Sequence, residues 1–563
     1  MKKWCRFNLT QYTKSKLAPS TIWGIAITFI LALFLLLFAL QAERNLLRWD
    51  EVDFFLCMEN VVRWGLPIYY AGEVNIDRSL LVHLSTRQLK GQEFAFYRYK
   101  PETRVLKETF FALTDGTSRY TYGMWHPPLY IYLGSLVFRF VYLPPENSHL
   151  LRYFNLIFSA GIFAGMWVLS RELYPSRHRQ TFLLALLLYT LTPLSVRGSV
   201  LIDYNATLGP CVALWFIVTY LKEARQYPHL WLILSTTLVL FTSLGIAVNL
   251  FIAASLYSLI TVALQGRDLQ RHSGKAISVI AGIALFLATF YILCRLLYLP
   301  FSQPFLHNFH FTWIRTRATI SSLVQWLSTS WDYFKWYMQE IGTPVMILFA
   351  ILTAKSLFRV RRTPRHILLP ITIATGLCTH AILRANAYWF PKYVLYLLPL
   401  LSVYLAGEAL GAASASPTFR KIVFAVIAFI LLVGMLDSLH WITYPGGTLY
   451  DKGQQGILTI ARALRTVTAP QEIVFCPKDV GFFAERKFIQ LWGAYFTDAN
   501  RLRERIDEAS VCYIVVFRGM LNGSTEIADF LNQEFFLQSE AGDFVLLRRK
   551  ADHCSLSLPP NDR

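Results

Sequence analysis

The sequence predicts an α-helical polytopic membrane protein with a small α/β domain at its C-terminal end. Hydrophobic residues make up 55% of the 563 residues and charged residues only 16%, whereas soluble domains carry about 25% charged residues. The mean hydropathy of +0.40 over this length indicates many membrane helices rather than a single anchor. From Thr443 onward the composition changes, and strand-like runs alternate with helical ones.

Residues 21–42 form the first predicted membrane helix. The run holds roughly 20 apolar residues, enough to cross the hydrocarbon core, and it is longer than the apolar core of a cleavable signal peptide. The basic residues that precede it place the N-terminus in the cytoplasm by the positive-inside rule. The loop that follows, residues 42–149, is then expected on the outer face of the membrane.

This outer loop is predicted to carry two short surface elements. An amphipathic helix over 50–66, ended by Gly65-Leu66-Pro67, is expected to lie on the membrane. Residues 71–121 are polar and aromatic, and a loop of this length is uncommon unless it is functional. The apolar run 129–142 is short for a membrane span, and it predicts a surface-lying or re-entrant segment.

Ten further spans are expected after the loop, so that the total is about 11. They lie at 150–170, 181–196, 206–220, twice within 230–264, and at 276–298, 343–358, 367–383, 393–410 and 422–439. The loops predicted inside all carry Lys or Arg, and we attribute much of the net charge of +19 to orientation signals rather than to nucleic-acid binding. An odd count places the C-terminus outside, whereas one missed helix would invert the second half.

We therefore divide the chain into a membrane-embedded domain, 1–442, and a small extracytoplasmic α/β domain, 443–563. In the second part, strands are predicted over 472–475, 511–517 and 544–547, and helices over 501–508 and 527–536. The eight cysteines show no metal-binding spacing. Cys476 and Cys512 could form a disulfide if this region faces an oxidising compartment.

Asp50 and Glu51, just past the first membrane helix, are the sharpest candidates for chemistry. Carboxylates at the bilayer surface keep access to water, and deeper in the bilayer they are costly and usually functional. A carboxylate here could take the proton from an attacking hydroxyl. The alternative is a pair at a helix end that contacts Arg44 or Arg48.

Two later residues are expected on the same outer side. Pro127 and Pro128 fix an extended approach to the next apolar run, so that His126 could face the surface that carries Asp50. There it could hold a phosphate, bind a metal or relay a proton, or serve only as an interfacial side chain. Asp203 could orient a catalytic group or simply pair with Arg197.

Cations and histidines occur in two further outer segments. Arg384 and Lys392-Tyr393 lie beside aromatic residues, which suits either a lipid phosphate or ordinary snorkelling anchors. His307 and His310, three residues apart, could share a divalent metal if their segment is helical. No third ligand is identified, so the need for a metal cofactor stays open.

In order and sidedness these motifs resemble the glycosyltransferases of the C fold (GT-C). The resemblance is to the subgroup related to the dolichyl-phosphate-mannose–protein mannosyltransferases and the lipid A aminoarabinose transferase. It is carried by Trp49-Asp50-Glu51, His126-Pro127-Pro128-Leu129, Asp203 and Lys392-Tyr393. The layout of about 11 helices followed by an outer domain is also similar.

The resemblance implies a sugar donor carried on a polyprenyl phosphate and used at the outer face of the cell membrane. Asp50 would be the base that activates an acceptor hydroxyl on a glycan, lipid or protein. His126 would lie near the donor phosphate. The Arg-Tyr pair common in such proteins stands here as Lys392-Tyr393, which keeps the charge but loses the bidentate fork.

Three other classes remain open on the sequence. A transporter or flippase would place ionisable residues at the middle of spans, whereas here the charged candidates gather at outer helix ends. A ligase or polymerase of polyprenyl-linked glycans would share the substrate class without these loop motifs. A non-catalytic scaffold would serve only to present the C-terminal domain.

Overall fold

The structure of the chain is a computed structural model. It describes residues 19–44, 46–47, 50–64, 67, 127–141, 143–222, 228–265, 269–297, 301, 304–305, 322–357, 364–383, 391–412, 417–443, 456–469, 472–491, 498–508, 510–521 and 526–550.

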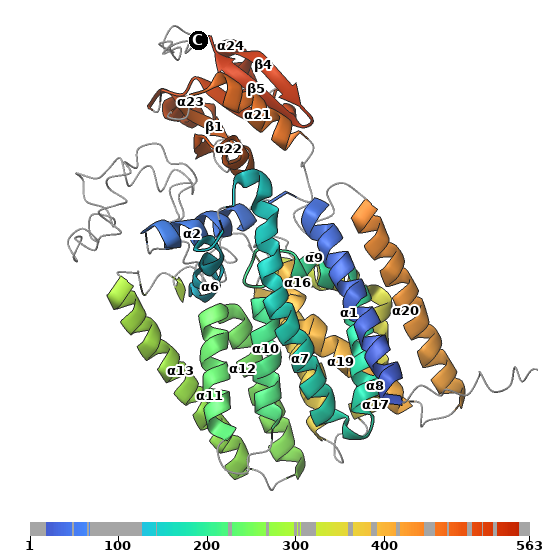
Figure 1. The fold of residues 1–563 in the computed structure, drawn as a ribbon. Coiled ribbons are helices and arrows are strands. Elements are labelled where there is room, and N and C mark those ends of the chain that lie inside the picture. Colours follow the sequence, from blue (N-terminus) through green and yellow to red (C-terminus); the bar gives the residue numbers. More distant parts are fainter. Residues whose placement is uncertain are drawn as a thin grey trace, which may run out of the picture.

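Helices account for nearly all of the described chain up to residue 443, and most of them run side by side in a bundle (Figure 1). Their bounds are α1 Pro19–Arg44, α2 Asp50–Trp64, α6 Leu129–Phe138, η2 Pro145–Phe154, α7 Asn155–Leu173, η3 Pro175–Arg177, α8 His178–Leu191, α9 Pro193–Ser199, α10 Leu208–Leu221, α11 Pro228–Thr242, α12 Leu244–Gln265, α13 Leu269–Leu297, α16 Leu323–Ile341, α17 Thr343–Leu357, η5 Pro364–Ile367, α18 Leu368–Leu383, η6 Pro391–Leu397, α19 Leu398–Ala412 and α20 Pro417–Thr443.

The protein is a multi-pass membrane protein. Six helical stretches among the described residues are long and apolar enough to cross a membrane, or up to eight if two bent pairs each form one span. A helix lies on every stretch that the sequence predicted as a span, although several, such as α10 with 14 residues, are short. Helix α16 was not predicted.

The two bent pairs owe their bends to local sequence. Helices α8 and α9 meet at 75°, where Thr192 is extended and Pro193 starts the second helix. Helices α16 and α17 meet at 101°. Between them Gly342 has a φ of +107°, a backbone conformation that residues other than glycine rarely adopt.

Helix α19 lies at the centre of the bundle, and α1 and α20 lie at its edge. The apolar window of the span 392–411 is 94% buried within the protein, compared with 22% for the spans of α1 and α20. Exposed large side chains such as Phe29 on α1 and Phe429 on α20 are therefore available to lipid.

Helices α2 and α6 pack at one end of the bundle, beneath the C-terminal region (Figure 1). The helix that the sequence predicted at 50–66 is confirmed as α2. Part of its apolar face is covered by protein: Phe55 meets Phe138 of α6 edge-on at 4.8 Å and Phe482 of the C-terminal region at 5.2 Å. Gly134 lets α6 approach α2, since a Cβ there would collide with Met58.

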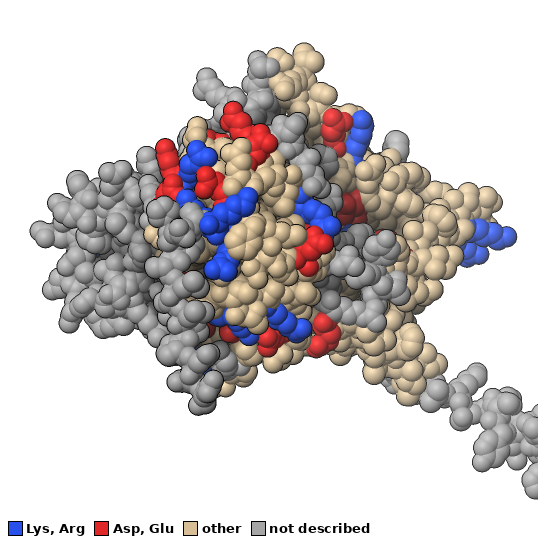
Figure 2. All heavy atoms as spheres, turned by 90° about the horizontal axis from the view of Figure 1, so that it is seen from above, with Lys and Arg blue, Asp and Glu red and all other residues tan. Residues whose placement is uncertain are grey.

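The C-terminal region is a small α/β unit with a five-stranded mixed sheet. Its strand order is β2-β1-β3-β5-β4, with β1 parallel to β2 and β3, and β5 antiparallel to β3 and β4. The elements are α21 Ile457–Val467, β1 Ile473–Cys476, α22 Lys478–Ala484, β2 Lys487–Gln490, α23 Ala499–Glu508, β3 Tyr513–Phe517, η8 Arg518–Met520, α24 Glu526–Glu534, β4 Phe535–Ala541 and β5 Phe544–Arg549. Seen from this end, acidic and basic side chains of the described residues are interspersed (Figure 2).

Most predicted elements of this region are confirmed, with two differences. The sequence did not predict α21, α22, β2 or β4. The helix expected at 527–536 ends at Glu534, and β4 begins at the next residue. The disulfide that Cys476 and Cys512 could have formed is absent, because Cys476 is a free, buried thiol and Cys512 is disulfide-bonded elsewhere. The parallel register puts Val474 beside Tyr513, so Cys512 lies about 10 Å along the strand from Cys476, beyond the reach of a disulfide.

Candidate functional site

A lysine joins two carboxylates at the end of the bundle that faces the C-terminal region. Lys392 Nζ donates to Asp50 Oδ2 at 2.6 Å and to Asp203 Oδ2 at 2.7 Å. The side chain of Asp50 is 39% exposed, whereas those of Lys392 and Asp203 are 5% and 0% exposed. The structure thus brings together three residues that the sequence nominated separately, and only Asp50 opens to solvent.

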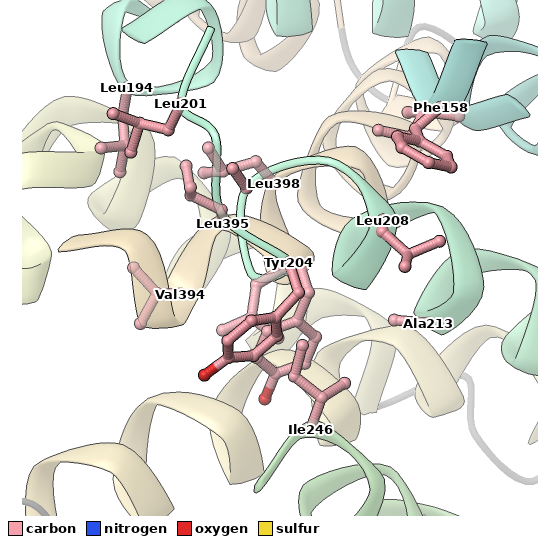
Figure 3. Close-up of a cluster of buried hydrophobic side chains, with 14 of the residues drawn as sticks. Phe158, Leu194, Leu201, Tyr204, Leu208, Ala213, Ile246, Val394, Leu395 and Leu398 are labelled. Carbon is pink, nitrogen blue, oxygen red and sulfur yellow. The ribbon is translucent and has the colours of Figure 1, made fainter. Parts of the chain in front are cut away.

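Asp203 is held by a tightly packed connection between α9 and α10. Its Oδ1 accepts the backbone N–H of Asn205 at 2.8 Å. Leu201 and Tyr204, on either side of it, pack into a cluster with Leu395 and Leu398 from the segment that carries Lys392 (Figure 3). Burial raises the pKa of Asp203, the charge of Lys392 opposes this rise, and the charge of Asp50 adds to it.

Lys392 is the second residue of η6 and has an aromatic neighbour. Its Nζ lies 5.4 Å from the centre of the Tyr393 ring, a cation–π distance. The Tyr393 ring stacks on His380, with centroids 6.1 Å apart, and His380 contacts the amide of Asn249 at 3.0 Å. Tyr393 therefore supports the lysine, and residues of α18 and α12 hold the tyrosine ring in place.

Glu51 has a different environment from its neighbour Asp50. It forms a bidentate ion pair with Arg152, with distances of 3.1 and 2.8 Å, and both side chains are 0% exposed. Arg152 also donates to the carbonyls of Ala42 and Leu46, and Ile202 N–H donates to Glu51 at 3.2 Å. The pair therefore fastens the end of α1, the start of α2 and the segment next to Asp203 to one another.

A second buried ion pair links α2 to the C-terminal region. Lys478 Nζ, at the start of α22, lies 2.7 Å from Asp53 Oδ2, and both side chains are 8% exposed. Burial alone would lower the pKa of Lys478, but the charges of Asp53 and Asp50 outweigh it and the pKa is raised. Sequence reasoning missed this pair: the spacing of Asp50 and Asp53 was a signal, but nothing local identified Lys478.

Other predicted site residues cannot be placed. His126, Arg384, His307 and His310 lie outside the residues that the structure describes. Within the described ranges no group of three His, Cys, Asp or Glu side chains could hold a metal ion. The alternative pairing of Asp203 with Arg197 is replaced by an ion pair between Arg197 and Glu340 at 3.3 Å.

An apolar cavity of about 780 Å³ lies between α6, α10, α11 and α13, and α6 packs against α2, the helix that carries Asp50. Its wall includes Leu129 and Tyr132 of α6. The hydroxyls of Thr219 and Thr237, which also line it, are bonded to helix carbonyls, so they leave the surface apolar. Tyr130, in the same turn of α6, contacts Phe54 edge-on at 5.7 Å, and Phe54 contacts Tyr204 beside Asp203 at 5.8 Å. Ring contacts thus connect α6, which contributes to the cavity wall, with the segment that carries Asp203.

No protein-family model and no curated protein sequence matches the chain, but solved structures do. ArnT from Cupriavidus metallidurans in the apo state aligns with a TM-score of 0.58 and 12% identity, over 94% of this chain and 98% of that one. The archaeal oligosaccharyltransferase AglB from Archaeoglobus fulgidus, in complex with an inhibitory peptide and a dolichol-phosphate, aligns with a TM-score of 0.51 and 11% identity, over 93% of this chain and 74% of that one. Both are GT-C folds, and this chain has the same fold, as the sequence predicted.

Proposed function

We propose that this chain is an integral-membrane glycosyltransferase that moves a sugar from a polyprenyl-phosphate donor to an acceptor hydroxyl on the outer face of the membrane. The observation that carries the proposal is the convergence of Asp50, Asp203 and Lys392 in a chain with the GT-C fold. These residues come from three segments of the chain, separated by up to 342 positions in sequence.

Asp50 is the general base in this mechanism. It is the one member of the trio with substantial exposure, 39%, so an acceptor hydroxyl can reach it from water. As the hydroxyl oxygen attacks the anomeric carbon, its proton passes to Asp50. The bond from that carbon to the phosphate oxygen breaks, and the phosphate leaves with the electron pair. A single displacement of this kind inverts the anomeric centre.

Lys392 neutralises the leaving phosphate. A cation that lies between two carboxylates can exchange one of them for a phosphate oxygen, and Asp203, which is buried, keeps it in place. Asp50 is then released to act on the acceptor. Tyr393 orients Lys392, and Glu51 positions Asp50 through Arg152. His126 and Arg384 are proposed as further contacts of the phosphate on sequence grounds alone, and His307 and His310 are kept as candidate metal ligands.

The apolar cavity suits the lipid part of the donor. Its walls of leucine and aromatic side chains offer burial without polar partners, as a hydrocarbon chain requires. The AglB structure contains a dolichol-phosphate, which supports a lipid-phosphate donor for a chain of the same fold.

We also propose the finer topology. The chain spans the cell membrane 11 times, with the N-terminus in the cytoplasm and a C-terminal domain, 443–563, outside. A helix on every predicted span supports this count. The disulfide at Cys512 supports an oxidising compartment for the C-terminal region. Because α22 contacts α2, the same compartment would hold Asp50.

The test is transfer from a polyprenyl-phosphate sugar by the purified protein in liposomes. Asp50→Asn keeps the shape but removes the base, and transfer is expected to fall by about 10²- to 10⁴-fold, the usual contribution of general base catalysis. Asp332→Asn is the matched control, since that carboxylate on α16 is 61% exposed and outside the trio. Full activity of Asp50→Asn would refute the proposed base. Uptake of a labelled lipid-linked sugar without transfer would instead favour a flippase.

A further inference from the structure

Helix α2 carries one carboxylate toward the membrane bundle and another toward the C-terminal region. Asp50 lies against Lys392 of η6, and Asp53 lies against Lys478 of α22. Side chains three residues apart on a helix are about 5–6 Å from each other at Cβ. A lysine from the C-terminal region is therefore within one helical turn of the proposed base.

The contact between α22 and α2 is a packed interface. All seven residues of α22 are buried, and Phe482 meets Phe55 of α2 edge-on at 5.2 Å. A second tie lies beside it: Arg465 of α21 donates to the Phe483 carbonyl at 2.8 Å and lies 3.6 Å from Glu146 of η2. Because of these contacts, a movement of the C-terminal region would also displace α2.

We propose that Lys478 is a positioning residue for the transfer reaction, which holds α2 in place through Asp53 and sets the electrostatic environment of Asp50. The proposal rests on the proposed function. The C-terminal region is accordingly part of the catalytic apparatus rather than an appended module. A buried carboxylate is strongly destabilised when its partner is removed, so loss of Lys478 displaces Asp53 and with it the first turn of α2.

The charges around Asp50 fix the expected pH effects. The charged groups around it are Lys392, Lys478, Asp53 and Asp203. Glu51 is neutralised by Arg152, and Asp479 lies beside Lys478 on α22. The positive charge of Lys478 favours the ionised form of Asp50, whereas the negative charge of Asp53 disfavours it. Removing one or the other should therefore move the acid limb of the pH–rate profile in opposite directions.

The experiment compares Lys478→Met, Asp53→Asn and the double variant in full-length protein in liposomes. Lys478→Met should move the acid limb up by roughly half a pH unit, and Asp53→Asn should move it down by a similar amount. Lys478→Met should also lower kcat by about tenfold with the donor KM within about twofold, because the base is displaced while the donor site is not. Lys478→Arg should retain most activity, and the double variant should recover much of the loss, since both charges of the buried pair are then removed together.

Hydrogen exchange of peptides from 50–64 gives a readout independent of activity. Lys478→Met should speed exchange in α2, whereas the control Arg518→Met, which breaks an exposed pair between η8 and Glu540 of β4, should not. Equal pH profiles and equal exchange in Lys478→Met, Asp53→Asn and the wild type would overturn the positioning role. Absence of transfer by the wild type would instead refute the proposed function, whatever the exchange shows. The two failures are therefore distinguishable.

Discussion

Replacing Lys392 by methionine is the sharpest perturbation of the proposed centre. The variant keeps a side chain of similar length but removes both charge-assisted bonds, at 2.6 Å to Asp50 and 2.7 Å to Asp203. Asp50 can be hydrated, since it is 39% exposed, whereas Asp203 is fully buried and, among the described residues, retains the Asn205 N–H as its hydrogen-bond donor. The cost of the substitution therefore falls on Asp203.

The magnitude follows from that burial. Removing one partner of a buried ion pair costs about 3–5 kcal/mol, and the lower end applies here because a backbone N–H still reaches Asp203. A cost of about 3 kcal/mol corresponds to roughly a 150-fold change in an equilibrium constant. The loss of the opposing cation also raises the pKa of Asp203 further, so the variant is expected to relieve part of the cost by protonating this carboxyl group as the pH falls.

The assay is thermal unfolding in detergent, followed by intrinsic fluorescence, together with transfer in liposomes. Lys392→Met should melt several degrees below the wild type, and the double variant Lys392→Met/Asp203→Asn should recover most of this loss, because neither charge remains. Transfer should stay low in both variants, since the phosphate still lacks its cation. Wild-type melting of Lys392→Met, or no recovery in the double variant, would refute the reasoning that Lys392 compensates a buried carboxylate.

Two further predictions follow from the other buried pairs. Glu51→Gln and Arg152→Met should each destabilise the protein by about 3–5 kcal/mol, more than Glu340→Gln, which breaks the partly exposed pair with Arg197. The double variant Glu51→Gln/Arg152→Met should be less destabilised than either single variant. Equal melting temperatures of Glu51→Gln and Glu340→Gln would contradict this. Because the pKa of Lys478 is raised in the folded protein, its pair with Asp53 should contribute stability below about pH 10 and lose it as the pH rises through the raised pKa; the melting temperatures of the wild type and Lys478→Met, measured against pH, should converge at high pH if the sign is right.

Local patterns were sufficient to predict the class of the protein and to identify candidate residues of the site. Asp50 was identified because it follows an apolar run of membrane length, and that placement depends only on neighbours along the chain. The strands around Val474 and Val515 were found from their β-branched, apolar composition. Motif order then predicted the GT-C fold, which the structural match confirms.

Predictions that required a partner in space were less successful. Glu51 was expected to act beside Asp50 or to contact Arg44 or Arg48, but its partner is Arg152, 101 residues away. A disulfide between Cys476 and Cys512 was left open by the sequence, and the parallel register of β1 and β3 keeps the two residues apart. The helix α2 was predicted, but the sequence did not reveal that α22 would pack against it.

The sequence by itself determined which segments form apolar helices, which candidate residues lie near the ends of those helices, and three of the five strands of the C-terminal sheet, because hydrophobic run length and periodicity are local properties. Only the tertiary structure decided that Lys392 lies between Asp50 and Asp203 and that Lys478 reaches Asp53. A charge can be buried only beside a partner, and the identity of that partner depends on which distant segments the packing of the helices brings together.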